Sequence, residues 1–187
     1  MKALCIVGSP RKNGCTAHIV DSIARGMKDN EIEVKTYILG EMKINYCKGC
    51  LTCNKTRKCI QQDDMDLIIT DLIDSDIILV ASPSYWGDVT GQLKVFFDRS
   101  NPYCNTGEGG TSIPTGKVGI AVAVRAGKNQ SENQHLIDTI NHYYSHLEIK
   151  PIESYTVEGI MYKEDFLGRE ELIEEAYKLG RRIKNLS

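Results

Sequence analysis

Four of the seven cysteines in this 187-residue chain lie within thirteen residues, at Cys47, Cys50, Cys53 and Cys59. The gaps between them are two, two and five residues. Four thiolates brought together by so short a loop are the ligand set of an iron–sulfur cluster. In a C-x2-C-x2-C segment each short gap turns the chain toward the next iron, and Gly49 eases that turn because glycine lacks a Cβ. We therefore expect the four sulfurs to bind a cluster.

Other interpretations of the cysteine segment stay open. A structural zinc site also uses four cysteines, but usually as two C-x2-C pairs separated by about a dozen residues or more. Disulfides suit a secreted protein, whereas this chain passes from Met1 directly into a strand pattern without an export leader. We therefore expect reduced thiols. Redox-active thiols and chance clustering are the remaining alternatives.

Basic side chains surround these cysteines, at Lys48, Lys55, Arg57 and Lys58. A cluster held by four thiolates carries net negative charge, which nearby cations would offset, and this would favour the reduced state. The alternative is a solvated basic loop. A shift in reduction potential on neutralising Lys55 and Arg57 together would support the first interpretation.

A second segment suited to chemistry runs from Gly8 to Thr16, between a predicted strand and a predicted helix. It offers backbone amides at a helix N-terminus, hydroxyl groups and two cations, all of which suit a phosphate. It matches neither G-x-G-x-x-G nor G-x-x-x-x-G-K-[ST], which disfavours a dinucleotide fingerprint and a nucleotide triphosphatase. The alternative is a polar turn in which Asn13 or Thr16 caps the helix.

A third segment, from Ser82 to Asp88, follows an apolar run and contains Tyr85 and Trp86, the only tryptophan. Aromatic side chains at the mouth of a sheet can contact a flat ligand, and Gly87 would let the backbone approach it. The alternative is packing of these rings against the next helix or in a subunit interface.

Alternating strands and helices must position these three segments. Continuous apolar runs at 3–7, 77–81 and 118–124 are typical of central parallel strands, and the mixed runs at 32–39 and 149–157 suit strands nearer the edges. Apolar residues at three- and four-residue spacings predict five helices. They are marked by Val20, Ile23, Ala24 and Met27; by Met65, Ile68, Ile69, Leu72 and Ile73; by Leu93, Val95 and Phe96; by Leu136, Ile137 and Ile140; and by Leu172, Ala176, Leu179 and Ile183.

Five such units predict an α/β fold, a doubly wound five-stranded parallel sheet with the flavodoxin-like order 2-1-3-4-5. In that order the ligand crevice lies at the carboxyl ends of strands 1 and 3, where the second and third segments begin. We expect a single domain over residues 1–187, with the cysteine-rich loop at about 45–62 as an insertion.

Charge and hydropathy exclude several classes of protein. The net charge of −2 and the pI near 6.1 show no basic excess for binding nucleic acid. No apolar run approaches the roughly 20 residues of a membrane span. We therefore expect a soluble, cytoplasmic protein.

Three motifs resemble the iron–sulfur flavoproteins, which belong to the NADPH-dependent FMN reductase group of flavodoxin-like proteins. The motifs are GSPRKNGCT, the CxxCxxC loop followed by Cys59 and Asp63-Asp64-Met65, and SPSYWGDVTGQLKVFFDRS. The resemblance extends over most of the chain and is strongest through residue 100. It implies noncovalent FMN, a [4Fe–4S] cluster on the cysteine loop, electron transfer between the two centres, and a homodimer or homotetramer.

The resemblance also implies which residues contact the cofactors. Many relatives have asparagine at the position of Cys15, so we expect its backbone amide to make the contact there. The third loop, often glycine-rich in relatives, begins at Arg125 and ends at Asn129 here. The implied FMN phosphate contacts are Ser9, Arg11, Asn13, Gly14, Cys15 and Thr16; the implied isoalloxazine contacts are Pro83, Ser84, Tyr85, Trp86, Gly87, Asp88, Ala126 and Gly127; and the implied cluster ligands are Cys47, Cys50, Cys53 and Cys59.

A flavin and a cluster together can link donors of electron pairs to single-electron carriers, and no acid or base side chain is obligatory. The expected redox partners are drawn from NAD(P)H, ferredoxin and quinones. One alternative is an NAD(P)H-dependent FMN or quinone reductase with redox-active or zinc-binding thiols in place of the cluster. Another is a phosphate-holding binding protein whose cysteine loop binds zinc and docks a partner.

Other residues carry less weight. His142 and His146 lie four apart on a predicted helix and could share a metal or form an exposed or interfacial face. We expect Cys5 to be a core residue. Cys104 lies in a polar, glycine-rich loop at 101–115 that is either a lid or a mobile segment. We assign no catalytic role to any of them.

Overall fold

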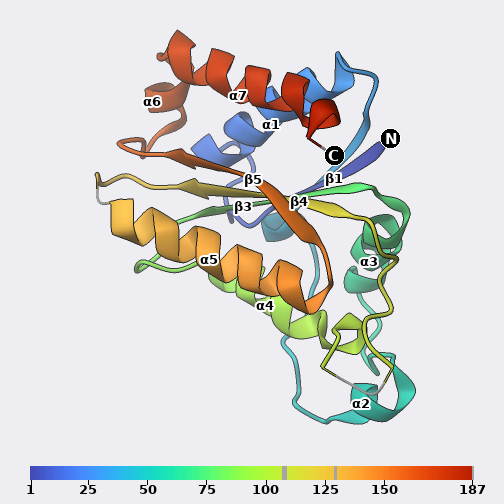
Figure 1. Cartoon of the computed structure of the whole chain (residues 1–187). Helices are drawn as coiled ribbons and strands as arrows, with labels where there is room; N and C mark the ends of the chain where they lie inside the picture. Colours follow the sequence, from blue (N-terminus) through green and yellow to red (C-terminus); the bar gives the residue numbers. More distant parts are fainter. Residues whose placement is uncertain (107–108, 129, 187) are drawn as a thin grey trace.

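The computed structural model describes residues 1–106, 109–128 and 130–186. Its centre is a parallel sheet with the strand order β2-β1-β3-β4-β5 (Figure 1). The flavodoxin-like order predicted from the sequence is therefore confirmed, and the mixed runs form the two edge strands. The strands are β1 (Lys2–Val7), β2 (Glu33–Ile38), β3 (Ile77–Pro83), β4 (Val118–Val124) and β5 (Lys150–Val157).

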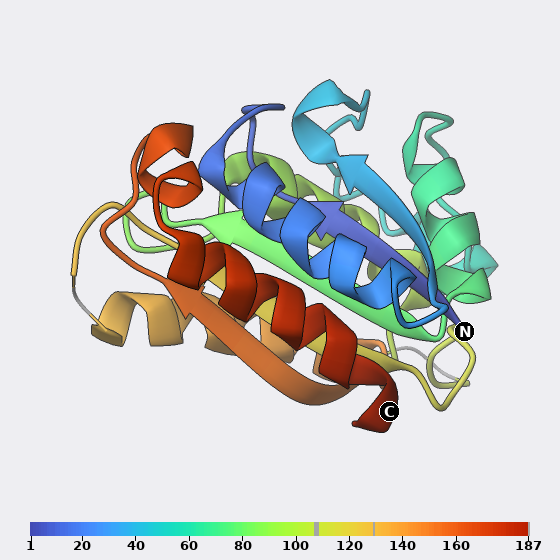
Figure 2. The same cartoon turned by 90° about the horizontal axis from the view of Figure 1, so that it is seen from above.

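Helices cover both faces of the sheet (Figures 1 and 2). One face carries α1 (Cys15–Lys28), α6 (Lys163–Leu167) and α7 (Glu170–Arg182), and the other carries α3 (Met65–Asp74), α4 (Gly91–Arg99) and α5 (Gln130–His146). The short helix α2 (Thr52–Thr56) lies outside these layers. Single 3-10 turns follow β2, α4 and α7, as η1 (Leu39–Glu41), η2 (Asn101–Tyr103) and η3 (Ile183–Asn185). Within the described ranges, no helix is long and apolar enough to cross a membrane.

The central strands are apolar on both sides because each side packs under a layer of helices. Successive side chains of a strand point to opposite faces. In β1, Leu4 and Ile6 therefore join the core under α3, α4 and α5, while Ala3, Cys5 and Val7 join the core under α1 and α7. Burial raises the pKa of the Cys5 thiol to about 12, which fits the predicted core role.

Glycines allow α1 and α7 to approach closely. A Cβ at Gly26 would lie 2.1 Å from the backbone oxygen of Tyr177, and a Cβ at Gly180 would lie 2.0 Å from that of Ile23. These distances are far below van der Waals contact, so any side chain at either position would force the helices apart.

The helices differ from the prediction in detail. Ile183, a marker of the last predicted helix, lies in η3 after α7 ends at Arg182. Ile73, a marker of α3, is exposed. The helices α2 and α6 span five residues each and were not predicted, because one turn is too short to show a repeat.

Candidate functional site

The loops that follow β1 and β3 lie side by side at the carboxyl ends of these strands. Gly8 donates its N–H to the backbone oxygen of Ala81 over 2.7 Å, and Thr90 Oγ1 donates to the backbone oxygen of Gly8 over 2.5 Å. A Cβ at Gly8 would lie 2.9 Å from Leu93 Cβ, so the close approach requires glycine. The two predicted ligand loops therefore lie next to each other at the topological switch point of the sheet.

The segment between β1 and α1 forms a compact turn. Arg11 donates its N–H to Ser9 Oγ over 3.1 Å, and Gly14 donates its N–H to the backbone oxygen of Arg11 over 3.2 Å. Gly14 is the N-cap of α1, and no side chain of the described residues caps the helix there. The capping role considered for Asn13 or Thr16 is therefore not observed. The first turn of α1 also lacks acidic residues, so its amides suit an anion.

The predicted phosphate contacts differ in their exposure. Burial, the largest influence, raises the pKa of the Cys15 thiol, so this sulfur is neutral at pH 7. The Arg11 Nη2 atom donates to the backbone oxygen of Met161 over 3.2 Å, which places this cation beside the loop after β5. The exposed contacts are Arg11 and Asn13, and the buried ones are Ser9, Gly14, Cys15 and Thr16.

The loop after β3 ends in a tight turn. Tyr85 and Asp88 exchange backbone hydrogen bonds of 2.9 and 3.2 Å. The two residues between them, Trp86 and Gly87, have φ angles of 57° and 79°. Positive φ angles at both central residues are typical of a two-residue turn of type I′. The Trp86 side chain is fully exposed, so packing of this ring against α4 is not observed.

A polar group that was not predicted from the sequence joins the loops after β3 and β4. Ser84 Oγ donates to Glu132 Oε1, and Arg125 Nη2 lies 2.6 Å from Glu132 Oε2. The backbone N–H of Ser84 also donates to the oxygen of Val124 over 2.7 Å. Glu132 lies in α5, 48 residues from Ser84, so no local spacing could have revealed the contact.

The third predicted loop reaches the same edge of the sheet. Ala126 and Gly127 are both exposed. A Cβ at Gly127 would lie 2.7 Å from Arg125 Nη2, so the guanidinium lies against this glycine. Asn129, the last residue of the predicted loop, lies outside the described residues.

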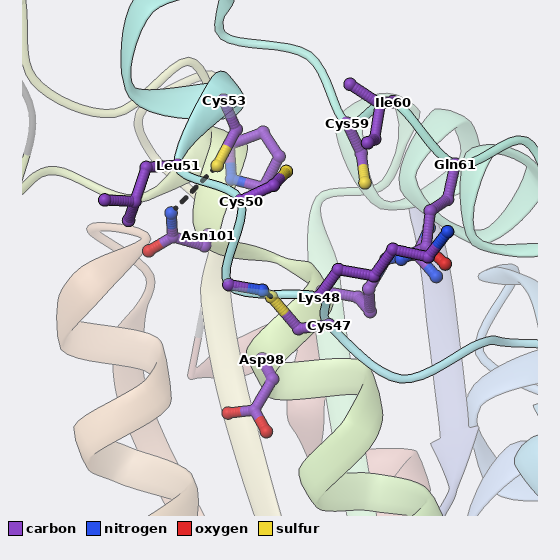
Figure 3. Close-up of a pocket in the computed structure, with 13 residues that line it drawn as sticks. Cys47, Lys48, Cys50, Leu51, Cys53, Cys59, Ile60, Gln61, Asp98 and Asn101 are labelled. Atoms are coloured by element: carbon purple, nitrogen blue, oxygen red, sulfur yellow. Dashed lines mark hydrogen bonds between the residues drawn. The ribbon is translucent and has the colours of Figure 1, made fainter.

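All four predicted cluster ligands line one pocket at the C-terminal end of α4 (Figure 3). Cys47 and Cys50 are exposed, whereas Cys53 and Cys59 are partly buried. No disulfide links the cysteines in the described ranges. The same pocket is lined by residues of the α4 end and of η2, namely Asp98, Arg99, Asn101 and Pro102.

Positive φ angles turn the chain around this pocket. Gly49 has a φ of 61°, as expected for the turn between Cys47 and Cys50. Leu51 and Arg57, the residues that flank α2, have φ angles of 58° and 55°. The short helix thus lies between two sharp turns.

A buried ion pair anchors the cysteine segment to α4. Arg99 Nη1 and Nη2 lie 2.6 and 3.1 Å from the Asp63 carboxylate oxygens, and the two side chains are 1% and 4% exposed. Burial is the largest single influence on Asp63 and raises its pKa. The Arg99 guanidinium and the N–H groups of Asn45 and Met65 outweigh it, so the pKa falls to about 2. This ion pair was not predicted from the sequence.

The basic residues around the cysteines differ in their exposure and in their hydrogen bonds. Lys48, Lys55 and Lys58 are exposed, in keeping with a solvated basic loop. Arg57 Nη2 donates to the backbone oxygens of Cys104 and Gly110 over 3.2 and 2.6 Å. Arg57 therefore ties the cysteine segment to the loop at 101–115, of which residues 107 and 108 lie outside the described residues.

The arrangement of the four sulfurs bears on which group they could hold. In the described parts of the chain, no three His, Cys, Asp or Glu side chains are placed to hold one metal ion. Four cysteine thiols lining one pocket are the type of ligand that an iron–sulfur cluster uses.

Helix α4 separates the two candidate sites. Its N-cap, Thr90, contacts the loop after β1, and its last residue, Arg99, lines the cysteine pocket. A helix of nine residues is about 13 Å long. In Figure 1, α2 lies at the far end of the molecule from the carboxyl ends of β4 and β5.

Two histidines of α5 lie near the cysteine pocket but outside it. His142 and His146 approach each other to 3.2 Å between their Nε2 atoms, and both line a neighbouring groove with Cys47 and Cys104. A shared metal is not supported by the ligand arrangement of the described residues. Their predicted alternative, an exposed face, fits His142.

Comparison with known proteins identifies the family. Residues 1–159 match the NADPH-dependent FMN reductase family. An iron–sulfur flavoprotein of Archaeoglobus fulgidus is 39% identical over 132 residues, which cover 71% of this chain but only 58% of that relative. One from Methanocaldococcus jannaschii is 34% identical over 146 residues, covering 78% of this chain and 73% of the relative. One from Methanosarcina thermophila is 29% identical over 182 residues, covering 96% and 93%.

Solved structures share the fold at low sequence identity. An NAD(P)H:quinone oxidoreductase from Methanothermobacter marburgensis superimposes with a TM-score of 0.77 at 14% identity, over 98% of this chain and 97% of that one. A flavodoxin from the domain Archaea gives a TM-score of 0.60 at 14% identity, over 98% and 96%. Together with the sequence relatives, these comparisons show that the chain belongs to the iron–sulfur flavoproteins of the NADPH-dependent FMN reductase family.

Proposed function

We propose that this protein is an oxidoreductase that transfers electrons between an FMN and a [4Fe–4S] cluster, linking a redox donor to an acceptor. The observation that carries the proposal is the convergence of Cys47, Cys50, Cys53 and Cys59 on one pocket, in a chain whose α1 N-terminus is suited to an anion. The iron–sulfur flavoproteins among its relatives support the same assignment.

In this proposal the crevice between the loops after β1, β3 and β4 holds FMN. The uncapped first turn of α1 and the Arg11 guanidinium bind the phosphate, because amide and charged N–H donors at a helix N-terminus favour an anion. The Ser84–Glu132–Arg125 group keeps the loops after β3 and β4 together around the ring. The proposed contacts are Ser9, Arg11, Asn13, Gly14, Cys15 and Thr16 for the phosphate and Pro83, Ser84, Tyr85, Trp86, Gly87, Asp88, Ala126 and Gly127 for the isoalloxazine.

The cysteine pocket holds the cluster through its four thiolates. When bound, FMN exchanges one or two electrons and the cluster exchanges one, so the pair can connect a hydride donor to single-electron carriers. The chain's own contribution is to bind and orient the two groups, and no acid or base residue is assigned. The proposed redox partners come from NAD(P)H, ferredoxin and quinones.

The assembly is also part of the proposal. We propose one FMN-binding domain over residues 1–187, with the cysteine-rich loop as an insertion, and a homodimer or homotetramer. Within one chain, the two sites are separated by α4, which is about 13 Å long. Light scattering on anaerobically purified protein tests the assembly directly, and a monomer would contradict it.

The experiment that tests the function is a count of flavin, iron, acid-labile sulfide and zinc per chain after anaerobic purification. About one FMN with about four iron and four sulfide is expected. Stepwise reduction should then bleach a flavin and a cluster absorption separately. Zinc without flavin would contradict the proposal altogether.

A second candidate is an NAD(P)H-dependent FMN or quinone reductase with redox-active thiols. One observation favours it: a hydrogen bond from the Thr52 side chain, the largest influence, lowers the pKa of the exposed Cys50 thiol. Low-pKa exposed thiols are the reactive ones. FMN without iron, together with NAD(P)H oxidation by cluster-free protein, would favour this candidate.

A further inference from the structure

The last turn of α4 and the residues that follow it direct N–H groups at the cysteine pocket. We propose that Asn101 and Arg99 are positioning residues that support the sulfurs of Cys53 and Cys59 by N–H donation and positive charge, and so raise the reduction potential of the cluster. This inference rests on the proposed function, which places a cluster in the pocket.

Asn101 makes a direct hydrogen bond to one sulfur. Its Nδ2 atom donates to Cys53 Sγ over 3.2 Å, as the dashed line in Figure 3 shows, and also lies 3.4 Å from Asn54 Oδ1. The Cys104 thiol donates to the backbone oxygen of Asn101 over 3.1 Å and lies 3.8 Å from Oδ1. Cys53 Sγ and Asn54 Oδ1, both acceptors, lie on the Nδ2 side of the amide and so orient its N–H group toward the sulfur. A deprotonated cysteine can only accept, so this bond strengthens on cluster ligation.

Arg99 places a buried guanidinium, paired with Asp63, in the lining of the cysteine pocket. Its side chain is 1% exposed, and its Nη atoms bind the Asp63 carboxylate and the backbone oxygen of Asn45. Its Nε is buried and has no hydrogen-bond partner within the described residues. The pocket that Arg99 lines also contains Cys59.

These contacts affect the potential because reduction adds negative charge to an already anionic cluster. N–H donors and cations near the ligand sulfurs stabilise that added charge, and hydrogen bonds to sulfur are among the influences that set cluster potentials. The N-cap of α4, Thr90, is hydrogen-bonded to the backbone oxygen of Gly8 at the end of β1. The donors at the other end of α4 are therefore held in place before the cluster binds.

The test is anaerobic potentiometric titration of the Asn101→Leu variant. Asn101 is exposed, so its replacement leaves the core intact. We expect the cluster potential to shift to a more negative value while the FMN potential stays unchanged, and iron to be lost faster to a chelator. Gln62→Leu, which replaces an exposed amide at the end of the cysteine-rich loop, is the control and should match the wild type in both measurements.

Arg99 requires a compensated variant because removing one member of a buried ion pair destabilises the fold. The double variant Asp63→Asn/Arg99→Gln leaves no unpaired charge and should also shift the cluster potential to a more negative value. Wild-type potentials and iron-release rates in both variants would overturn the inference. Wild-type protein that binds FMN but no iron would overturn the proposed function first, and iron analysis separates the two failures.

Discussion

At the scale of single residues, the cysteine segment depends on charges and amides that lie far away in the sequence. Asp63 is central, because it accepts from Arg99 and from the N–H groups of Asn45 and Met65. These bonds favour the ionised carboxylate. The aspartate therefore connects α4, the approach to the cysteines and the start of α3.

The depressed pKa of Asp63 predicts a loss of stability in acid. Its folded pKa of about 2 lies below its ordinary value of 3.8, so its contribution is present above pH 4 and is lost as the pH falls toward 2. Linkage gives this contribution a size of roughly 2 kcal/mol. Urea unfolding of the double variant Asp63→Asn/Arg99→Gln, which leaves no unpaired buried charge, should show a flatter pH dependence between pH 5 and pH 2.5 than the wild type. Parallel curves would contradict the assignment.

At the scale of elements, the turn before α1 and the contact between α1 and α7 each lead to a prediction. The turn carries the free amides of α1 and the cation of Arg11, whereas the helix contact leaves no room for a side chain. Arg11 and Gly26 report on these two features separately.

Replacing Arg11 by glutamine should weaken FMN binding. Loss of a charge-assisted contact is worth about 1.5–3 kcal/mol, or roughly 10- to 100-fold in Kd. Fluorescence titration of flavin-free protein measures it. Lys12→Gln is the control, because Lys12 is paired with Glu41 over 2.8 Å, and it should bind FMN nearly as the wild type does. Riboflavin lacks the phosphate and should bind all three proteins alike; an equal loss for riboflavin would place Arg11 away from the phosphate.

Replacing Gly26 by alanine should destabilise the fold. The new Cβ would lie 2.1 Å from the backbone oxygen of Tyr177, and overpacking of this kind costs about 1–3 kcal/mol. Gly91→Ala is the matched control, because a Cβ there meets open space at the first residue of α4, and it should be neutral or stabilising by up to about 1 kcal/mol. Relative to the wild type, the Tm should therefore fall for Gly26→Ala and stay equal or rise for Gly91→Ala. Equal Tm values for the two variants would contradict the close contact.

At the scale of the whole molecule, the two candidate sites lie at opposite ends of α4 and share no side chain. The proposed FMN site is built on the loops at the carboxyl ends of β1 and β3, and the cysteine pocket on a segment anchored by Arg99 and Asp63. The two cofactors should therefore be separable by mutation.

Cys50→Ser tests this separation. Cys50 is exposed, so its replacement should abolish or cripple the cluster while FMN still binds with wild-type affinity. Iron and flavin analysis measures the two outcomes, and far-UV circular dichroism checks the fold. Collapse of the whole fold would indicate a structural metal instead. Cys104→Ser, a partly buried cysteine outside the predicted ligand set, should keep its iron.

The sequence by itself determined the strands, the long helices, their order in the sheet and the four cysteines. These features are local or follow from general rules: apolar runs and helical spacings report burial directly, and right-handed crossovers restrict the topology. The close cysteine spacing likewise predicted one pocket, because a short segment cannot carry its sulfurs far apart.

Only the tertiary structure decided which distant side chains complete each site. Arg99 reaches Asp63 across 36 residues, Asn101 reaches Cys53 across 48, and Ser84 reaches Glu132 across 48. No periodicity connects such positions, since they meet only after α4 and α5 have packed on the sheet. The candidate loops could therefore be located in the sequence, whereas the distant side chains that hold them in place could not.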